Sequence, residues 1–138
     1  MAITHLLDTS VYSQPLRKHP LEAVQRRWIG LGDDRLCSSM ICEAELLFGL
    51  ELRSSKRLWK AYEAILHGRL PILEVDLDVA RSYATLATRM RKRGMTRSPF
   101  DLLIAATAHA RGLTLATCNY KDFAPIEGLA VEDWSSPP

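Results

Sequence analysis

Apolar and polar residues follow one another along the chain in short blocks whose period changes repeatedly. Short apolar runs predict buried strands, and longer segments with an apolar residue at every third or fourth position predict amphipathic helices. The expected strands cover residues 3–7, 35–39, 71–75, 113–117 and 129–131, and the expected helices cover residues 21–31, 41–53, 56–68, 77–93 and 100–111. Strands that alternate with helices predict an α/β fold, with a mostly parallel sheet between two layers of helices.

Capping residues define the ends of the last two helices. Gly94 and Gly112 each follow a helical segment directly, where glycine is a common stop. Ser98 and Pro99 precede the second of these helices as a cap and a first-turn residue. Because residues 100–111 are apolar nearly all round, we expect this helix to be central and buried.

Composition indicates one globular domain. The chain has 138 residues, of which 47% are hydrophobic and 25% charged, and no shift in composition marks a boundary. We therefore expect a single domain over residues 1–138. No apolar run approaches the ~20 residues that span a bilayer, and the first residues lack the basic flank and apolar core of a signal peptide. We expect a cytoplasmic protein that does not contact a membrane.

Charge and metal-binding residue types exclude some classes of function. The formal net charge of +2 is too small to indicate nucleic-acid binding by itself. The three cysteines contain no C-x-x-C pair, and the four histidines show no zinc-ligand spacing. A zinc site or a disulfide framework is therefore not expected.

Two aspartates stand where catalytic groups commonly lie in parallel sheets, beyond the carboxyl ends of strands. Asp8 follows the first predicted strand directly, and Thr9 and Ser10 could orient it or a bound water. Asp101 lies in the first turn of the buried helix. Each has a structural alternative: Asp8 could bond its own backbone in a turn, and Ser98 with Asp101 fits a capping box.

A glutamate on the helix over residues 41–53 is the most unusual residue of the chain. At ~100° per residue, Glu45 lies inside the stripe formed by Ile41, Phe48 and Leu52. A glutamate within an apolar stripe is costly unless a cation or hydrogen bonds meet it. Glu43 lies near a second apolar strip, so the helical wheel alone does not separate the two glutamates.

A fourth group of polar side chains follows the strand over residues 113–117. Asn119 and Asp122 can both coordinate a cation, directly or through water, although an ordinary turn is the alternative. Carboxylates that gather at one edge of a sheet repel one another, and a divalent cation relieves the conflict. Oxygen ligands favour Mg²⁺ or Mn²⁺ over Zn²⁺. Such a site suits hydrolysis of a phosphodiester.

A run of basic residues precedes the helix that carries Asp101. No acid interrupts the run, whose members are Arg89, Arg91, Lys92, Arg93 and Arg97. A basic edge beside an acidic pocket suits a polyanionic substrate, so the four arginines are candidates for contacts with an RNA backbone. The alternative is a solvated helix end, where cations are favoured in any protein.

Together these motifs resemble the PIN-domain ribonucleases, and specifically the VapC toxins of bacterial VapBC toxin–antitoxin pairs. The matching segments are residues 6–10 (LLDTS), 39–49 (SMICEAELLFG), 99–106 (PFDLLIAA), 117–123 (TCNYKDF) and 128–134 (GLAVEDW). They span nearly the whole chain in the order and at the spacing of the family.

The resemblance implies an α/β/α sandwich and an endoribonuclease that depends on Mg²⁺, with Mn²⁺ able to substitute. It assigns Asp8, Glu45 and Asp101 to the acidic site, with Asp8 and Asp101 as metal ligands and Glu45 as the residue that positions the metal or the attacking water. Many PIN domains carry an aspartate where this chain has Asn119, so either the Asn119 amide or Asp122 would fill the fourth position. The resemblance also implies a homodimer and a VapB-type antitoxin as partner.

Further roles and other functions are weighed beside this one. Thr9, Ser10 and Ser39 are candidates for side chains that support the acidic site. A phosphoryl-transfer hydrolase of another family would need a second aspartate where Ser10 stands, and its glycine-rich phosphate loop is absent. A non-catalytic α/β binding module would use the same acids only for a turn, a cap and a buried ion pair.

Overall fold

The computed structural model describes residues 2–137, and a five-stranded parallel sheet lies at the centre of the molecule. The strands are β1 (His5–Leu7), β2 (Leu36–Ser39), β3 (Ile72–Leu73), β4 (Thr114–Thr117) and β5 (Val131–Asp133). Their order across the sheet is β3-β2-β1-β4-β5, so the first strand of the chain is the middle one. The predicted α/β class is confirmed.

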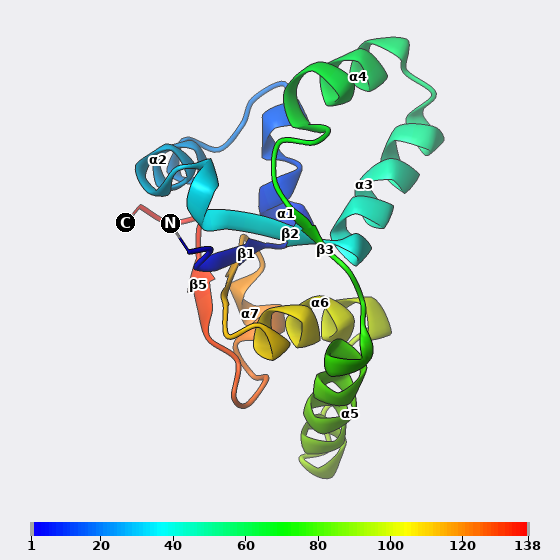
Figure 1. Cartoon of the computed structure of the whole chain (residues 1–138), viewed down its shortest axis with the longest axis vertical. Coiled ribbons are helices and arrows are strands. Elements are labelled where there is room, and N and C mark those ends of the chain that lie inside the picture. Colours follow the sequence, from blue (N-terminus) through cyan, green and yellow to red (C-terminus); the bar gives the residue numbers. More distant parts are fainter. Residues whose placement is uncertain (1, 138) are drawn as a thin grey trace.

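Helices cover both faces of this sheet, which confirms the three-layer arrangement. In Figure 1, α1, α2 and α4 lie on one side of the sheet, and α5 and α6 lie on the other. The helices are α1 (Thr9–Tyr12), α2 (Glu22–Leu31), α3 (Met40–Arg53), α4 (Lys56–Ala61), α5 (Leu77–Lys92), α6 (Pro99–Ala110) and α7 (Tyr120–Phe123). Single turns of 3₁₀ helix, η1 (Gln14–Leu16) and η2 (Asp33–Arg35), and a π-helical turn, η3 (Tyr62–Leu66), complete the elements.

Several boundaries differ from those expected. The helix predicted over residues 56–68 changes to a π-helical turn after Ala61. The strand predicted over residues 71–75 keeps only two residues, because β3 is an edge strand that pairs with β2 alone. The last strand begins at Val131, two residues later than expected, because its ladder with β4 runs from Leu115 to Thr117.

The core lies between the sheet and the helices. Leu6, Leu7, Leu115 and Ala116, on the two central strands, are inaccessible to solvent. Helix α6 packs across one face, and six of its twelve residues are buried, in keeping with its apolar composition. Among residues 2–137, no helix is both long and apolar enough to cross a lipid bilayer.

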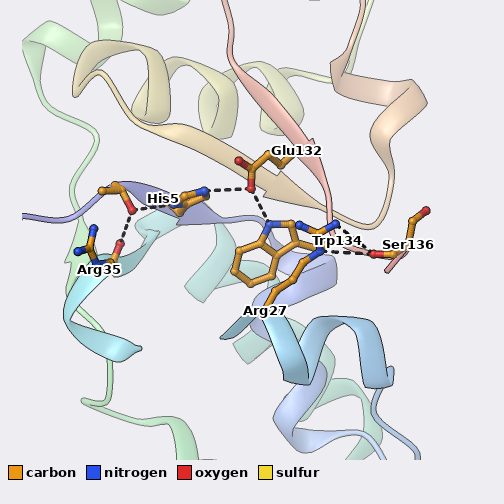
Figure 2. Close-up of polar contacts among 7 residues, drawn as sticks. His5, Arg27, Arg35, Glu132, Trp134 and Ser136 are labelled. Atoms are coloured by element: carbon orange, nitrogen blue, oxygen red, sulfur yellow. Dashed lines mark hydrogen bonds and ion pairs between the residues drawn. The ribbon is translucent and has the colours of Figure 1, made fainter. Parts of the chain in front are cut away.

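A polar cluster joins the first and last strands at the end of β1 away from Asp8. The His5 imidazole Nε2 lies 3.0 Å from Glu132 Oε1, and the indole N–H of Trp134 donates to the same oxygen at 3.1 Å. Figure 2 shows this chain of contacts beside Arg27, which donates to the carbonyl of Ser136. Burial alone would raise the pKa of Glu132, but the Trp134 hydrogen bond and the nearby His5 lower it below its usual value.

Candidate active site

Asp8 stands at the carboxyl edge of the sheet, between the two central strands. It follows β1, its backbone N–H donates to the carbonyl of Ala116 on β4, and its side chain caps α1 by accepting from the Val11 N–H. The turn interpretation is therefore correct as far as it goes. The same carboxylate accepts further hydrogen bonds and is only 3% exposed, so capping is not its whole environment.

Two hydroxyl groups hold the Asp8 carboxylate on either side. Ser10 Oγ donates to Oδ1 at 2.6 Å, and Thr117 Oγ1 donates to Oδ2 at 2.6 Å. Each hydroxyl in turn accepts a backbone N–H of the segment after β4: Ser10 from Cys118 at 2.9 Å, and Thr117 from Asn119 at 2.8 Å. The carboxylate is thereby fixed in orientation by a residue of α1 and by the last residue of β4.

Burial and hydrogen bonds set the electrostatic environment of Asp8. Burial raises the pKa of its carboxyl above 3.8, against the hydrogen bonds from Ser10 and Thr117, which lower it. The ion pairs formed among residues 2–137 do not include Asp8. An oriented, buried carboxylate is the environment in which a bound metal ion would be most stabilising.

Asp101 lies at the start of α6 and is half-buried. Its backbone N–H donates to Ser98 Oγ at 3.1 Å, which is the expected helix cap. Burial raises the pKa of Asp101, and the neighbouring carboxylate of Asp122 raises it further, whereas Ser98 and the charge of Arg97 lower it. The structure therefore places Asp122 close enough to Asp101 for the two acids to repel each other.

Glu45 contacts the residue next to Asp8. Thr9 Oγ1 donates to Glu45 Oε1 at 2.5 Å, which brings the start of α1 against α3. The apolar stripe in which Glu45 lies is largely open to solvent, because Phe48 and Leu52 are 68% and 73% exposed. The side of α3 that faces the core carries Cys42, Leu46 and Leu50. A helix with two apolar strips does not reveal which strip is covered.

Glu43 is the glutamate that reaches the buried side of α3. Its two carboxylate oxygens accept hydrogen bonds from the hydroxyls of Tyr12, at 2.8 Å, and Tyr62, at 2.7 Å. Burial raises the pKa values of both tyrosines, and their hydrogen bonds to the Glu43 carboxylate raise them further. Glu43 thus joins α1, α3 and η3 and has its hydrogen bonds satisfied within the fold.

The remaining polar candidates occupy neighbouring positions. Ser39, the last residue of β2, caps α3 by accepting the Cys42 N–H at 3.1 Å, and is fully buried. Asn119 begins α7 without using its side chain as a cap, so its amide stays available to a ligand. Thr117 was not singled out from the sequence. Its only signal there was a hydroxyl at a strand end, two residues before Asn119.

A cavity of about 500 Å³ opens beside Thr9 and Glu45. Its wall carries five side chains that can be cationic, none of which was predicted as functional: Arg17, Lys18, His19, Arg53 and Arg57. They come from the η1 segment, the end of α3 and the start of α4, far apart in the sequence. Positive charge around a cavity that reaches Glu45 favours an anionic ligand.

The four arginines predicted to contact RNA do not line this cavity. Arg89, Arg93 and Arg97 direct guanidinium groups at backbone carbonyls between residues 121 and 127, whereas Arg91 lines a separate cavity between α5 and α6. Contact of these four arginines with RNA stays a prediction.

The donor set suits a hard divalent cation. Across residues 2–137, no three side chains of His, Cys, Asp or Glu stand together in a ready-made metal site. Mg²⁺ does not need one, since it commonly binds through one or two carboxylates and keeps several waters. Asp8 and Asp101, both with pKa values raised by burial, are carboxylates that a cation would stabilise in the charged form.

Comparison with known proteins agrees with this geometry. A family model described as "PIN domain" matches residues 5–128. The tRNA(fMet)-specific endonuclease VapC of Salmonella typhimurium is 30% identical over 129 residues, which cover 94% of this chain and 96% of the relative. The VapC ribonuclease Y4jK of Sinorhizobium fredii is 34% identical over 134 residues, which cover 92% and 93%.

Solved structures extend the likeness to three dimensions. FitAcB from Neisseria gonorrhoeae matches with a TM-score of 0.86 at 31% identity, over 95% of this chain and 98% of that one. DNA-bound VapBC from Salmonella typhimurium matches with a TM-score of 0.83 at 30% identity, over 96% and 98%. A family model that covers most of the chain, and relatives of this identity and coverage, carry one conclusion: the chain belongs to the PIN-domain family, in its VapC group.

Proposed function

We propose that the chain is a divalent-metal-dependent endoribonuclease that acts as the toxin of a toxin–antitoxin pair in the cytoplasm. The buried, oriented carboxylate of Asp8 at the end of the central strand is the observation that supports this most. The names of the VapC relatives, which describe ribonucleases and a tRNA-specific endonuclease, support RNA as the substrate. The preferred ion would be Mg²⁺, with Mn²⁺ as a substitute.

Each acidic residue has a distinct part in this proposal. Asp8 and Asp101 would hold the cation, and Asp122 or Asn119 would complete the set. A cation at this place supplies activation of water and neutralisation of charge that develops on the phosphate. Glu45, held by the Thr9 hydroxyl at 2.5 Å, would accept the proton of the attacking water as a general base.

The basic cavity beside Glu45 would hold the RNA backbone. Arg53 and Arg57, together with Arg17 and Lys18, would contact phosphates next to the acidic residues. Such contacts orient the strand without reading its sequence. A salt dependence of binding follows, because each neutralised phosphate releases counterions.

A partner protein belongs to the proposal. The solved relatives include VapBC complexes and a FitAB complex, three of them described as bound to DNA. We therefore propose a VapB-type antitoxin for this chain, and a homodimer as its own assembly. Light scattering on the isolated chain tests the homodimer. Light scattering after co-expression with a small reading frame found beside the gene tests the antitoxin complex.

A cleavage assay tests the activity. Purified protein is incubated with total RNA and with transfer RNA in Mg²⁺, Mn²⁺ or EDTA, beside Asp8→Ala, Asp101→Ala and Glu45→Gln. Glu51→Gln, an exposed substitution on the same helix as Glu45, is the matched control. We expect discrete fragments with either metal, none in EDTA, and none with the three site variants.

A binding measurement separates a failed assay from a wrong function. A cation at 100 times its Kd stabilises the fold by about 2.7 kcal/mol, so Mn²⁺ should raise the melting temperature of the wild type but not of Asp8→Ala. Intact RNA together with no Mn²⁺-dependent shift would favour the non-catalytic binding module. Fragments that persist in the variants would point to a contaminating nuclease.

A further inference from the structure

Three arginines form a row along one side of α5 and the turn that follows it. Arg89, Arg93 and Arg97 are spaced four residues apart, and we call them the arginine row. Arg97 Nε donates to the carbonyl of Asp122 at 2.7 Å, Arg93 Nη1 to Pro125 at 3.0 Å, and Arg89 Nη1 to Glu127 at 3.5 Å. The row therefore follows the chain from α7 toward β5, one carbonyl after another.

The segment held in this way carries a candidate site residue. Residues 121–127 are anchored from the inside by Phe123 and Ile126, each 2% exposed. The backbone of the exposed Asp122 has no such anchor of its own, and Arg97 supplies one through its Nε and, at 3.4 Å to Lys121, its Nη2. A two-pronged contact to consecutive carbonyls fixes the direction of the chain at Asp122.

The backbone at Gly128 lies close to the guanidinium of Arg89, the first member of the arginine row. It has a φ of +88°, and a Cβ at this position would lie 2.9 Å from Nη1 of Arg89. Glycine adopts this conformation without strain, and any other residue here would also require the end of the Arg89 side chain to shift. The segment therefore ends at a residue whose lack of a side chain admits the first member of the row.

The last member of the row also lies beside the other acidic helix. The positive charge of Arg97 acts on Asp101, and the negative charge of Asp122 acts on the same carboxyl in the opposite direction. Arg97 thus binds the backbone that carries one acid and is a charged neighbour of the other. Arg91 serves as the internal comparison, because within residues 2–137 it makes no hydrogen bond to this segment.

We propose that the arginine row is a positioning device for the acidic site, and that Arg97 sets where Asp122 stands relative to Asp101. The proposal rests on the proposed function, since it concerns the same metal-dependent site. It replaces RNA contact as the principal role of Arg89, Arg93 and Arg97. The guanidinium groups act through the backbone of residues 121–127, so these arginines are positioning residues, not catalytic ones.

Amide hydrogen exchange in EDTA tests the mechanical half of the proposal. The amides of Asp122, Ala124 and Ile126 donate to the carbonyls of Asn119, Tyr120 and Phe123, so their exchange reports on opening of the segment. We expect severalfold faster exchange at these amides in Arg97→Gln and Arg93→Gln, and wild-type rates in Arg91→Gln. Circular dichroism confirms that each variant is folded. Unchanged exchange in the first two variants would overturn the proposal.

Mn²⁺ binding, followed through the resonance signal of the free ion, tests the functional half. Coulomb's law alone predicts that removing the Arg97 charge tightens cation binding. Positioning predicts the reverse: roughly tenfold weaker binding in Arg97→Gln, as for other residues that orient metal ligands. Arg97→Lys, which keeps a charge and a donor, should recover part of the loss. Equal or tighter binding in Arg97→Gln would overturn the proposal.

The two measurements distinguish this proposal from the proposed function. If the wild type takes up no Mn²⁺ and cleaves no RNA, the proposed function fails, whatever the variants do. Faster exchange in that case would leave the row as a support for the loop only, which overturns its role at a metal site. If the wild type binds Mn²⁺ and Arg97→Gln binds it equally well, the function stands and only the positioning role fails.

Discussion

The carboxylate of Asp8 accepts three hydrogen bonds, and burial nevertheless raises its pKa above 3.8. A group whose pKa is higher in the folded chain than in the unfolded chain is less favourably ionised after folding. Its charge therefore destabilises the apoprotein above the folded pKa, and this penalty disappears as the pH falls below the unfolded value of 3.8. The residue best placed for metal binding is thus a cost to the metal-free fold.

Asp8→Asn should relieve that cost. In EDTA at about pH 7, we expect the variant to melt at or above the wild-type temperature, with the difference narrowing as the pH is lowered toward 4. In saturating Mn²⁺ the order should reverse, since only the wild type gains from the cation. Ser10→Ala, which removes a donor to Asp8, is the control and should melt lower. An Asn variant that melts well below wild type in EDTA at neutral pH would contradict the prediction.

Glu43 should matter for stability and not for chemistry. Glu43→Ala leaves the hydroxyl of Tyr12, which is 1% exposed, without its acceptor, and we expect a loss of about 2 kcal/mol in the free energy of unfolding by urea. Glu43→Gln should lose less, because an amide can accept from one tyrosine and donate to the other. Glu51→Ala, an exposed substitution on the same helix, should change the free energy of unfolding by less than about 0.5 kcal/mol. A Glu43→Ala variant as stable as this control would show that the two tyrosine contacts contribute little.

The sequence predicted where Asp8 and Asp101 lie in the fold, at a strand end and in a first helical turn, and burial raises the pKa of both carboxyls. Their role in a metal site stays a prediction. The helical wheel could not show which of Glu43 and Glu45 lies on the buried side of α3, because the burial of either apolar strip depends on which elements pack against the helix. Thr117 went unnoticed because its importance arises from Asp8, which is 109 positions away.

At the scale of elements, the sequence predicted the long helices well and missed α1 and α7. Each of these has four residues and no hydrophobic period to detect. Both begin just after a central strand, and α1 is closed by the side chain of Asp8 itself. The π-helical turn over Tyr62–Leu66 was not predicted either; its first residue, Tyr62, donates a hydrogen bond to Glu43, 19 positions earlier in the chain.

The loop after α7 should be sensitive to a single methyl group. Gly128→Ala places a Cβ 2.9 Å from Arg89 and an alanine at a φ of +88°, so we expect a loss of at least about 1 kcal/mol in unfolding free energy. Arg89→Ala in the same chain removes the steric part and should restore some of the loss. Gly94→Ala, also at positive φ but with open space around it, isolates the conformational part. Equal losses of unfolding free energy in Gly128→Ala and Gly94→Ala would show that the Arg89 side chain moves aside without cost.

At the scale of the whole molecule, one sheet and one continuous core predict a single cooperative unit over residues 1–138. Thermal unfolding followed by far-ultraviolet circular dichroism and by tryptophan fluorescence should give coincident transitions. Trp28 lies in α2, Trp59 lies in α4, and Trp134 directly follows β5, so their fluorescence reports on three parts of the fold. Separate midpoints for the two probes would divide the chain into more than one domain.

The strand order has a consequence for how the protein is made. The middle strand, β1, is the first to leave the ribosome, and its neighbour β4 is among the last. Until Thr117 has emerged, Asp8 lacks the hydroxyl on its Oδ2 and the strand that covers its other side. A nascent or truncated chain that ends before β4 therefore carries Asp8 without the Thr117 hydroxyl and the neighbouring strand that orient its carboxylate. Synthesis itself delays the appearance of a complete toxin until most of the chain exists.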